Sequence, residues 1–160
     1  SEVKKRGVDF ELTIVGSGPL HEELVGLSEK FELNDCIYFA GALSQSSVIS
    51  MLNQSDIFIL SSRCEGLPIV CMEAMASGTI LIAPRINGIP ELVQDRINGF
   101  LFESESVLNL TEVICWANNN KNCMKEISLL AREKIENEFS RKKSTKKLLN
   151  IITYKISQHE

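Results

Sequence analysis

The stretch that decides the fold is Ser61-Ser62-Arg63-Cys64-Glu65-Gly66-Leu67-Pro68-Ile69-Val70-Cys71-Met72-Glu73-Ala74-Met75-Ala76-Ser77-Gly78. It follows the apolar run Ile57–Leu60, which is typical of a strand buried on both faces. Pro68 suits the first turn of a helix, where its missing N–H costs nothing, and Gly78 suits the end of that helix. The stretch therefore predicts a strand, then a loop, then a short helix.

Glu73 is the one charged residue of the predicted helix, which is otherwise apolar on every side between Pro68 and Ala76. A helix that is apolar all round is normally buried, and an unpaired buried charge costs roughly several kcal/mol. Two interpretations remain open. Glu73 either forms a salt bridge, with Arg63 or Arg85 as its partner, or accepts hydrogen bonds from the hydroxyl groups of a ligand.

The start of this helix is suited to an anion. Backbone N–H groups of Gly66 and Leu67 would face the ligand there, because helix N-termini favour negative charge. Glu65 lies just before them, in the loop at the carboxyl end of the strand, where ligands bind in open α/β sheets. The sequence thus predicts a phosphate site bracketed by two carboxylates, Glu65 and Glu73.

The rest of the chain alternates strands and helices up to residue 103, which is the signature of βαβ units. We therefore predict an α/β fold with a Rossmann-like, doubly wound parallel sheet flanked by helices, and helices alone after residue 104. The basic residues 1–9 are interpreted as the end of a helix that begins upstream. Expected strands are 10–15, 37–40, 56–60, 79–83 and 99–102, and expected helices are 19–31, 46–53, 68–76, 91–93, 105–118, 122–138 and 141–156.

Length and composition predict one soluble, intracellular domain. The chain has 160 residues, of which 44% are hydrophobic and 24% charged, and no apolar run reaches membrane-spanning length. Five cysteines form no C-x-x-C pair and are odd in number, so reduced core thiols are expected. With two histidines and no D-x-D pair, no bound metal is expected. A nucleic-acid partner is not expected either.

Charge is unevenly distributed along the chain. Residues 1–120 carry seven Lys and Arg against sixteen Asp and Glu, whereas residues 121–160 carry ten against five. The basic C-terminal part is interpreted either as a solvated helix face or as a surface for anionic lipid or an acidic partner.

Two further turns follow predicted strands. Gly16-Ser17-Gly18-Pro19 resembles the start of a dinucleotide fingerprint, but His21 occupies the position of its third glycine, so an NAD site is not expected. This turn either lets a ligand approach the backbone or is purely structural. In Asn87-Gly88-Ile89-Pro90-Glu91, Gly88 permits close approach of a ligand and Glu91 complements the helix dipole. No P-loop and no G-x-S-x-G motif is present.

Taken in order, these segments resemble the donor-binding, C-terminal domain of GT-B glycosyltransferases of the large family four (group 1), which includes many bacterial cell-surface polysaccharide enzymes. The resemblance covers about residues 8–103. Its most specific part is the E-x7-E pair, Glu65 and Glu73. The other matching pieces are Gly16-Ser17-Gly18-Pro19, Phe39-Ala40-Gly41, Gly88-Ile89-Pro90-Glu91 and Asn98-Gly99-Phe100-Leu101.

The resemblance implies a nucleotide-diphosphate sugar as donor, no cofactor and retention of anomeric configuration. Glu65 would contact the donor sugar and stabilise charge at the reacting carbon, and Glu73 would hold the ribose hydroxyls. The nucleotide base would lie near Ala40, Gly41 and Leu43. The remaining donor-binding positions it implies are Gly16, Ser17, Gly18, Gly66, Leu67, Pro68, Ile69 and Gly88.

Two departures from the family pattern are visible. An upstream βα unit with an Arg and a Lys, and the acceptor-binding domain, are not within these residues, so we expect residues 1–160 to be a truncated donor domain that cannot transfer sugar alone. In addition, Asn87 stands where a second glycine is common. The acceptor would be a sugar or lipid-linked sugar bound through the N-terminal domain, and the enzyme would be cytoplasmic, either at the inner face of the membrane or away from it.

Alternative functions on the same fold are a nucleotide-sugar epimerase and a non-catalytic nucleotide-sugar sensor or scaffold. The E-x7-E context speaks against the epimerase, and a scaffold needs neither Glu65 nor Glu73.

Overall fold

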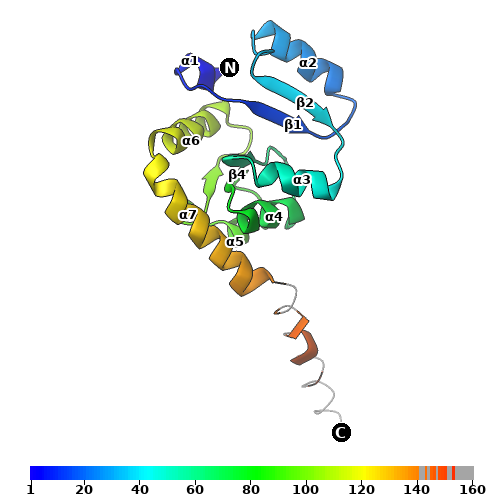
Figure 1. Ribbon diagram of the computed structural model, residues 1–160, viewed down its shortest axis with the longest axis vertical. Coiled ribbons are helices and arrows are strands. Elements are labelled where there is room, and N and C mark those ends of the chain that lie inside the picture. Colours follow the sequence, from blue (N-terminus) through cyan, green and yellow to red (C-terminus); the bar gives the residue numbers. More distant parts are fainter. Residues whose placement is uncertain (141–142, 144, 147, 151–152, 154–160) are drawn as a thin grey trace.

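A computed structural model describes residues 1–140, 143, 145–146, 148–150 and 153 of the chain. Helices and strands alternate as the sequence predicts (Figure 1), although several boundaries shift by one to three residues. The elements are α1 (Glu2–Lys5), β1 (Leu12–Val15), α2 (His21–Lys30), β2 (Ile37–Gly41), α3 (Gln45–Leu52), β3 (Ile57–Ile59), α4 (Ile69–Ser77), β4 (Ile80–Pro84), α5 (Ile89–Leu92), β5 (Phe100–Phe102), α6 (Val107–Asn119), α7 (Lys121–Lys134) and the π-helix η1 (Ile135–Phe139).

All strand pairing between these elements is parallel, which confirms the predicted class of α/β fold. The strands form two sheets, however, rather than one: β1 pairs with β2, and β3, β4 and β5 form a second sheet in that order. Within the part of the chain that the structure describes, no strand pairs with the second edge of β1 or of β3. The single continuous sheet expected from the sequence is therefore interrupted between β1 and β3.

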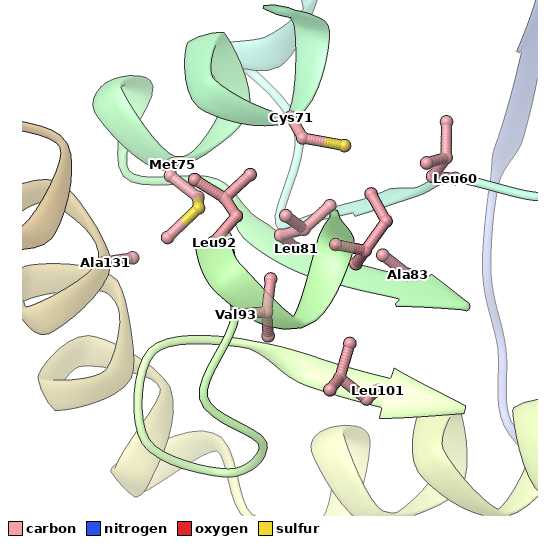
Figure 2. Packing of buried hydrophobic residues seen from close by; sticks show 10 residues of the cluster. Leu60, Cys71, Met75, Leu81, Ala83, Leu92, Val93, Leu101 and Ala131 are labelled. Carbon is pink, nitrogen blue, oxygen red and sulfur yellow. The ribbon is translucent and has the colours of Figure 1, made fainter. Parts of the chain in front are cut away.

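The core is built on β4, whose five residues are all buried. Its side chains alternate, so Leu81 and Ala83 contact α4 and α5 on one face while Ile80 and Ile82 contact α6 on the other. Figure 2 shows the first of these clusters, in which Cys71 and Met75 of α4 approach the sheet. A strand buried on both faces explains why its sequence is a continuous apolar run.

Helix α7 packs near the amino end of β4. The Ser128 hydroxyl donates a 2.7 Å hydrogen bond to the carbonyl oxygen of Gly78, the residue that ends α4 with the left-handed φ of 85° that favours glycine. Ile127 and Ala131 of α7 enter the two core clusters. The amino end of the sheet is thus occupied by a helix, while polar loops follow the carboxyl ends of the strands.

The part of the fold formed by β1, β2 and α2 is much less buried. It lies at one end of the molecule, apart from the helices around β4 (Figure 1). Leu24 and Leu27 of α2 and Phe31, which follows the helix, remain exposed, as does Val15 of β1. The spacing of Leu20, Leu24 and Leu27 predicts an apolar face turned toward the core, but all three side chains are exposed in the described structure.

Several expectations need correction. Pro19 does not open a helix, because α2 begins at His21 after a turn. The predicted helix 122–138 becomes α7 followed by the π-helical turn η1. Most of the predicted helix 141–156 lies outside the described residues. No helix within the described residues is both long and apolar enough to cross a membrane.

The five cysteines are all unpaired, but they are not uniformly core thiols. Cys71 is buried and Cys36 and Cys115 are half-buried, whereas Cys64 and Cys123 are exposed. Burial raises the pKa of the Cys71 thiol from 9.0 to about 12, and the negative charge of Glu65 contributes further in the same direction. Cys71 therefore remains a neutral, packed thiol at physiological pH.

This pKa shift predicts a pH-dependent loss of stability. Because the folded-state pKa lies above the unfolded value, the contribution of Cys71 is fully present below pH 9 and is lost as the pH rises from 9.0 to about 12. The free energy of unfolding should fall by about 1.4 kcal/mol per pH unit more in the wild type than in Cys71→Ala. Urea denaturation at a series of pH values measures the difference. An equal fall of the free energy of unfolding with pH in the two proteins would contradict the raised pKa of Cys71.

Candidate donor-binding site

The predicted site residues lie at the end of β2, in α4, and in the loops that follow β1, β2, β3 and β4. Because parallel strands point the same way, the loops that follow neighbouring strands emerge at the same edge of their sheet. Contacts between residues distant in sequence connect these segments. Among them are Gly16 with Gly41, Gln45 with Glu73, Glu65 with Asn87, and Gly66 with Gly88.

The contact between Gly66 and Gly88 joins the loops after β3 and β4. A Cβ atom placed on Gly88 would lie 2.6 Å from the carbonyl oxygen of Gly66 and 3.3 Å from its carbonyl carbon. Only glycine fits there, since real Cβ atoms do not approach backbone this closely. The glycine in the sequence predicts close approach of a ligand at Gly88, whereas in the structure the neighbouring loop occupies that side.

Glu65 lies in the same loop as Gly66 and is half-buried. None of the ion pairs within the described residues involves its carboxylate. Backbone N–H groups of Gly66 and Leu67 likewise have no backbone acceptor within those residues, and both residues are exposed. A negative group and two available donors therefore stand side by side before α4.

Glu73 is half-buried in α4 and is held by an uncharged partner. The side-chain amide of Gln45, the first residue of α3, donates a 2.7 Å hydrogen bond to Glu73 Oε1. The salt-bridge interpretation is wrong for the described residues, because Arg63 pairs with Glu105 at 2.7 Å and Arg85 with two other acids. Those two acids are Asp95, at 3.6 Å, and Glu103, at 3.3 Å.

Gln45 is the residue that sequence reasoning missed. The signal that was available is Ser44, whose side chain accepts a hydrogen bond from the Ser47 N–H and so caps α3. Recognising this cap would have placed Gln45 at the first position of the helix that follows β2. Its contact with Glu73 depends on the packing of α3 against α4, which local sequence does not reveal.

Pro68 and Ile69 lie at the start of α4. Pro68 is the N-cap, with an extended ψ of 128°. The helix begins at Ile69, one residue later than predicted. Ile69 is 66% exposed and Leu67 is 37% exposed, so both present apolar surface beside the free N–H groups. This combination of apolar surface and backbone donors suits a ligand with a sugar or base next to a phosphate.

The loops after β1 and β2 meet through backbone atoms. The Gly16 N–H donates a 2.8 Å hydrogen bond to the Gly41 carbonyl oxygen, and both glycines have positive φ, 135° and 66°. Ser17, Gly18 and Ala40 are exposed beside them, and Leu43 is half-buried. The structure thus shows a structural role for the Gly16 turn and leaves its surface accessible.

A groove of about 340 Å³ runs between α3, α4 and α7, and Glu73 contributes to its wall. None of the other predicted site residues lines it. The remaining lining residues are Ile49, Asn53, Ala76, Ser77 and Arg132.

The described residues contain no group of three or more His, Cys, Asp or Glu side chains arranged to hold a metal ion. The expectation that no metal is needed stays a prediction.

The resemblance segment that begins at Asn98 has a structural role at its first two residues. The buried Asn98 accepts a 2.7 Å hydrogen bond from the Gln94 N–H and donates one of 3.3 Å to the Leu92 carbonyl oxygen. Gly99, at φ 158°, lies so close to β4 that a Cβ atom there would be 3.0 Å from the Leu81 carbonyl oxygen. Asn98-Gly99 therefore fixes the entry into β5 rather than a ligand.

Comparison with known proteins identifies the family. The family described as "Glycosyl transferases group 1" matches residues 1–134, so the chain belongs to that family. Among curated relatives, the amylovoran biosynthesis glycosyltransferase AmsK of Erwinia amylovora is 30% identical over 156 residues, which are 94% of this chain and 38% of that protein. The chain thus spans about two fifths of such a relative.

Solved structures agree on the fold. The sucrose-phosphate synthase of Thermosynechococcus elongatus matches with a TM-score of 0.85 at 19% identity, over 98% of this chain and 41% of that one. The Anabaena protein HepE, solved in complex with UDP, matches with a TM-score of 0.84 at 19% identity, over 91% of this chain and 41% of that one. The fold is that of one part of a GT-B glycosyltransferase.

The packing of Gly88 predicts the effect of adding one methyl group. Gly88→Ala should displace the Glu65 loop and lower the free energy of unfolding by about 1–3 kcal/mol, because the new Cβ would overlap the Gly66 carbonyl. Urea denaturation measures this change. Gly26→Ala in α2 is the matched control: its Cβ would meet nothing within 4 Å, so stability should stay level or rise. Equal free energies of unfolding for the two variants would contradict the close contact between Gly88 and Gly66.

Proposed function

We propose that this chain is the donor-binding part of a retaining glycosyltransferase that transfers a sugar from a nucleotide-diphosphate sugar to an acceptor. The observation that carries the proposal is the pair of carboxylates, Glu65 and Glu73, without a cationic partner among the described residues. They flank the free N–H groups of Gly66 and Leu67 at the start of α4. Family membership and the UDP bound by HepE support the same reaction.

The chemistry follows from where charge develops. When the bond between the anomeric carbon and the diphosphate oxygen breaks, the diphosphate leaves with negative charge and the sugar carbon becomes positive. Backbone donors at Gly66 and Leu67, together with the dipole of α4, would stabilise the departing phosphate. The Glu65 carboxylate would stabilise the positive carbon and accept hydrogen bonds from sugar hydroxyls.

Glu73 has a different role in this proposal. Its carboxylate would accept hydrogen bonds from the ribose hydroxyls of the nucleotide. Gln45 supports this role because its 2.7 Å hydrogen bond orients the carboxylate without neutralising it. The base would lie against the loop of Ala40, Gly41 and Leu43, and Gly16 to Gly18 would line the same cleft. No metal takes part in the proposed reaction.

The proposal extends to the location and acceptor of the enzyme. Cell-surface polysaccharide synthesis is supported by the relative from amylovoran biosynthesis. The acceptor, a sugar or lipid-linked sugar, would bind through a separate N-terminal domain. A cytoplasmic location at the inner membrane face is motivated by the basic residues 121–160, among them Lys121 and Lys125 of α7.

We also propose that an upstream strand completes the sheet. Helix α1 precedes β1, as the helix of a βα unit precedes the next strand. The second edges of β1 and β3 have no strand partner within the described residues. A parallel strand reached by a right-handed crossover would lie beside β1. One such strand, placed between β1 and β3, would join the two sheets and satisfy both edges.

The two carboxylates should have separable effects on the full-length enzyme. Glu65→Gln should lower kcat by about 100-fold or more, because it removes charge stabilisation at the reacting carbon. Glu73→Ala should weaken nucleotide binding by about ten-fold, because it removes a ribose acceptor. Steady-state kinetics measure the first effect, and calorimetric titration with UDP, GDP and ADP measures the second and identifies the base.

A conservative surface change, Glu112→Gln on the exposed side of α6, is the matched control and should behave as wild type. A scaffold or sensor predicts no sugar transfer by the wild type and no effect of Glu65→Gln on any activity. An epimerase predicts conversion of the nucleotide sugar without an acceptor. Either result would overturn the proposed reaction.

The isolated chain of 160 residues should bind nucleotide weakly at best and should not transfer sugar. The reason is that the acceptor domain and the cationic groups expected to neutralise the leaving diphosphate would lie on the upstream part of the enzyme. A turnover assay with a sugar nucleotide and the acceptor of the full-length enzyme tests this. Sugar transfer by the 160 residues alone would refute the proposal that transfer needs the upstream part of the enzyme.

A further inference from the structure

The loop that carries Glu65 has very few contacts of its own. The structure describes all of residues 61–67. Apart from bonds within helices and strands, no backbone N–H of this loop donates a hydrogen bond to a backbone carbonyl, and no backbone carbonyl of the loop accepts one from a backbone N–H. Arg63 is paired with Glu105, but both side chains are mostly exposed, so this ion pair contributes little. The position of Glu65 must therefore be fixed from outside the loop.

One side chain provides that contact. The Asn87 side-chain amide donates a 2.9 Å hydrogen bond to the carbonyl oxygen of Glu65 and lies 3.6 Å from the Sγ of Cys64. It is the one hydrogen bond to the backbone of residues 61–67 found among the described residues. The next residue, Gly88, meets Gly66 backbone to backbone, so the two contacts reach adjacent peptides of the Glu65 loop.

Asn87 is itself firmly placed. Its φ of 40° lies in the left-handed region, which asparagine tolerates better than most residues. The turn around it is closed by hydrogen bonds from the Ile86 N–H to Pro84, at 2.9 Å, and from the Ile89 N–H to Ile86, at 3.0 Å. Ile89 is fully buried in the core, so the turn is anchored to the folded domain.

We propose that Asn87 is a positioning residue for the glycosyl transfer: its side-chain amide holds the Glu65 peptide so that the Glu65 carboxylate and the Gly66 and Leu67 N–H groups keep one orientation toward the donor. This role rests on the proposed function of Glu65. Asn87 does not touch the reacting atoms in this account. It acts through the backbone of the loop. Small displacements of catalytic groups such as the Glu65 carboxylate reduce reaction rates strongly.

Two variants remove the amide donor in different ways. Asn87→Gly keeps the left-handed backbone without strain, so global stability should not fall. Asn87→Asp keeps the size and shape of the side chain, but its carboxylate accepts rather than donates. Asn120→Asp is the matched control, because Asn120 donates an equivalent 2.8 Å hydrogen bond to the Trp116 carbonyl at the end of α6.

The first measurement is the rate of trypsin cleavage after Arg63 in the full-length protein, followed by mass spectrometry. Cleavage needs local opening of the loop and reports its population. Asn87→Gly and Asn87→Asp should be cut about five-fold faster after Arg63, while cleavage after Arg96, in a separate loop, stays unchanged. Asn120→Asp should match wild type at both sites. Wild-type cleavage after Arg63 in both Asn87 variants would overturn the proposal.

The second measurement is steady-state sugar transfer. Both Asn87 variants should lose about ten-fold in kcat with the donor KM within about two-fold of wild type. The displaced loop acts on charge that develops in the transition state, whereas Glu73 and the residues proposed to contact the nucleotide base lie outside residues 61–67. Faster cleavage with an unchanged kcat would overturn the positioning role. If the wild type transfers no sugar from any nucleotide sugar, the proposed function fails, and the cleavage rates still decide whether Asn87 holds the loop.

Discussion

The burial of β4 on both faces and along both edges is the constraint on which the rest of the structure depends. Its pairing with β3 and β5 leaves neither edge open, and its alternating side chains fill two separate clusters. Because every residue of Ile80–Pro84 is buried, its ends can lie only where the surrounding helices place them. The loops after β3 and β4 are therefore brought together by a fully buried strand.

The two ends of this sheet are chemically different. At the amino end, α7 packs near Gly78 through the hydroxyl of Ser128 and through apolar residues that enter both clusters. At the carboxyl end, polar and glycine-rich loops leave the Glu65 carboxylate and the Gly66 and Leu67 N–H groups without partners among the described residues. The packed core and the candidate site are thus separated in space, so the candidate site can carry uncompensated groups that a core would not tolerate.

The candidate site is held by contacts between loops rather than within them. Glycine backbone meets glycine backbone at Gly16 and Gly41 and at Gly66 and Gly88, while Gln45 reaches across from α3 to Glu73. Such contacts orient the functional groups without burying them. A neutral amide beside Glu73 leaves the charge of the carboxylate available, which an arginine in the same place would not.

The sequence by itself determined the kind of elements, their order, the parallel α/β class and the E-x7-E loop and helix. These features follow from local sequence patterns, namely apolar runs of strand length, glycine and proline at helix ends, and two glutamates at a fixed spacing. Tertiary structure decided which groups meet. Gln45 as the partner of Glu73, Gly66 as the neighbour of Gly88 and the gap between the two sheets depend on contacts between segments more than twenty residues apart, and local pattern carries no information about such distances.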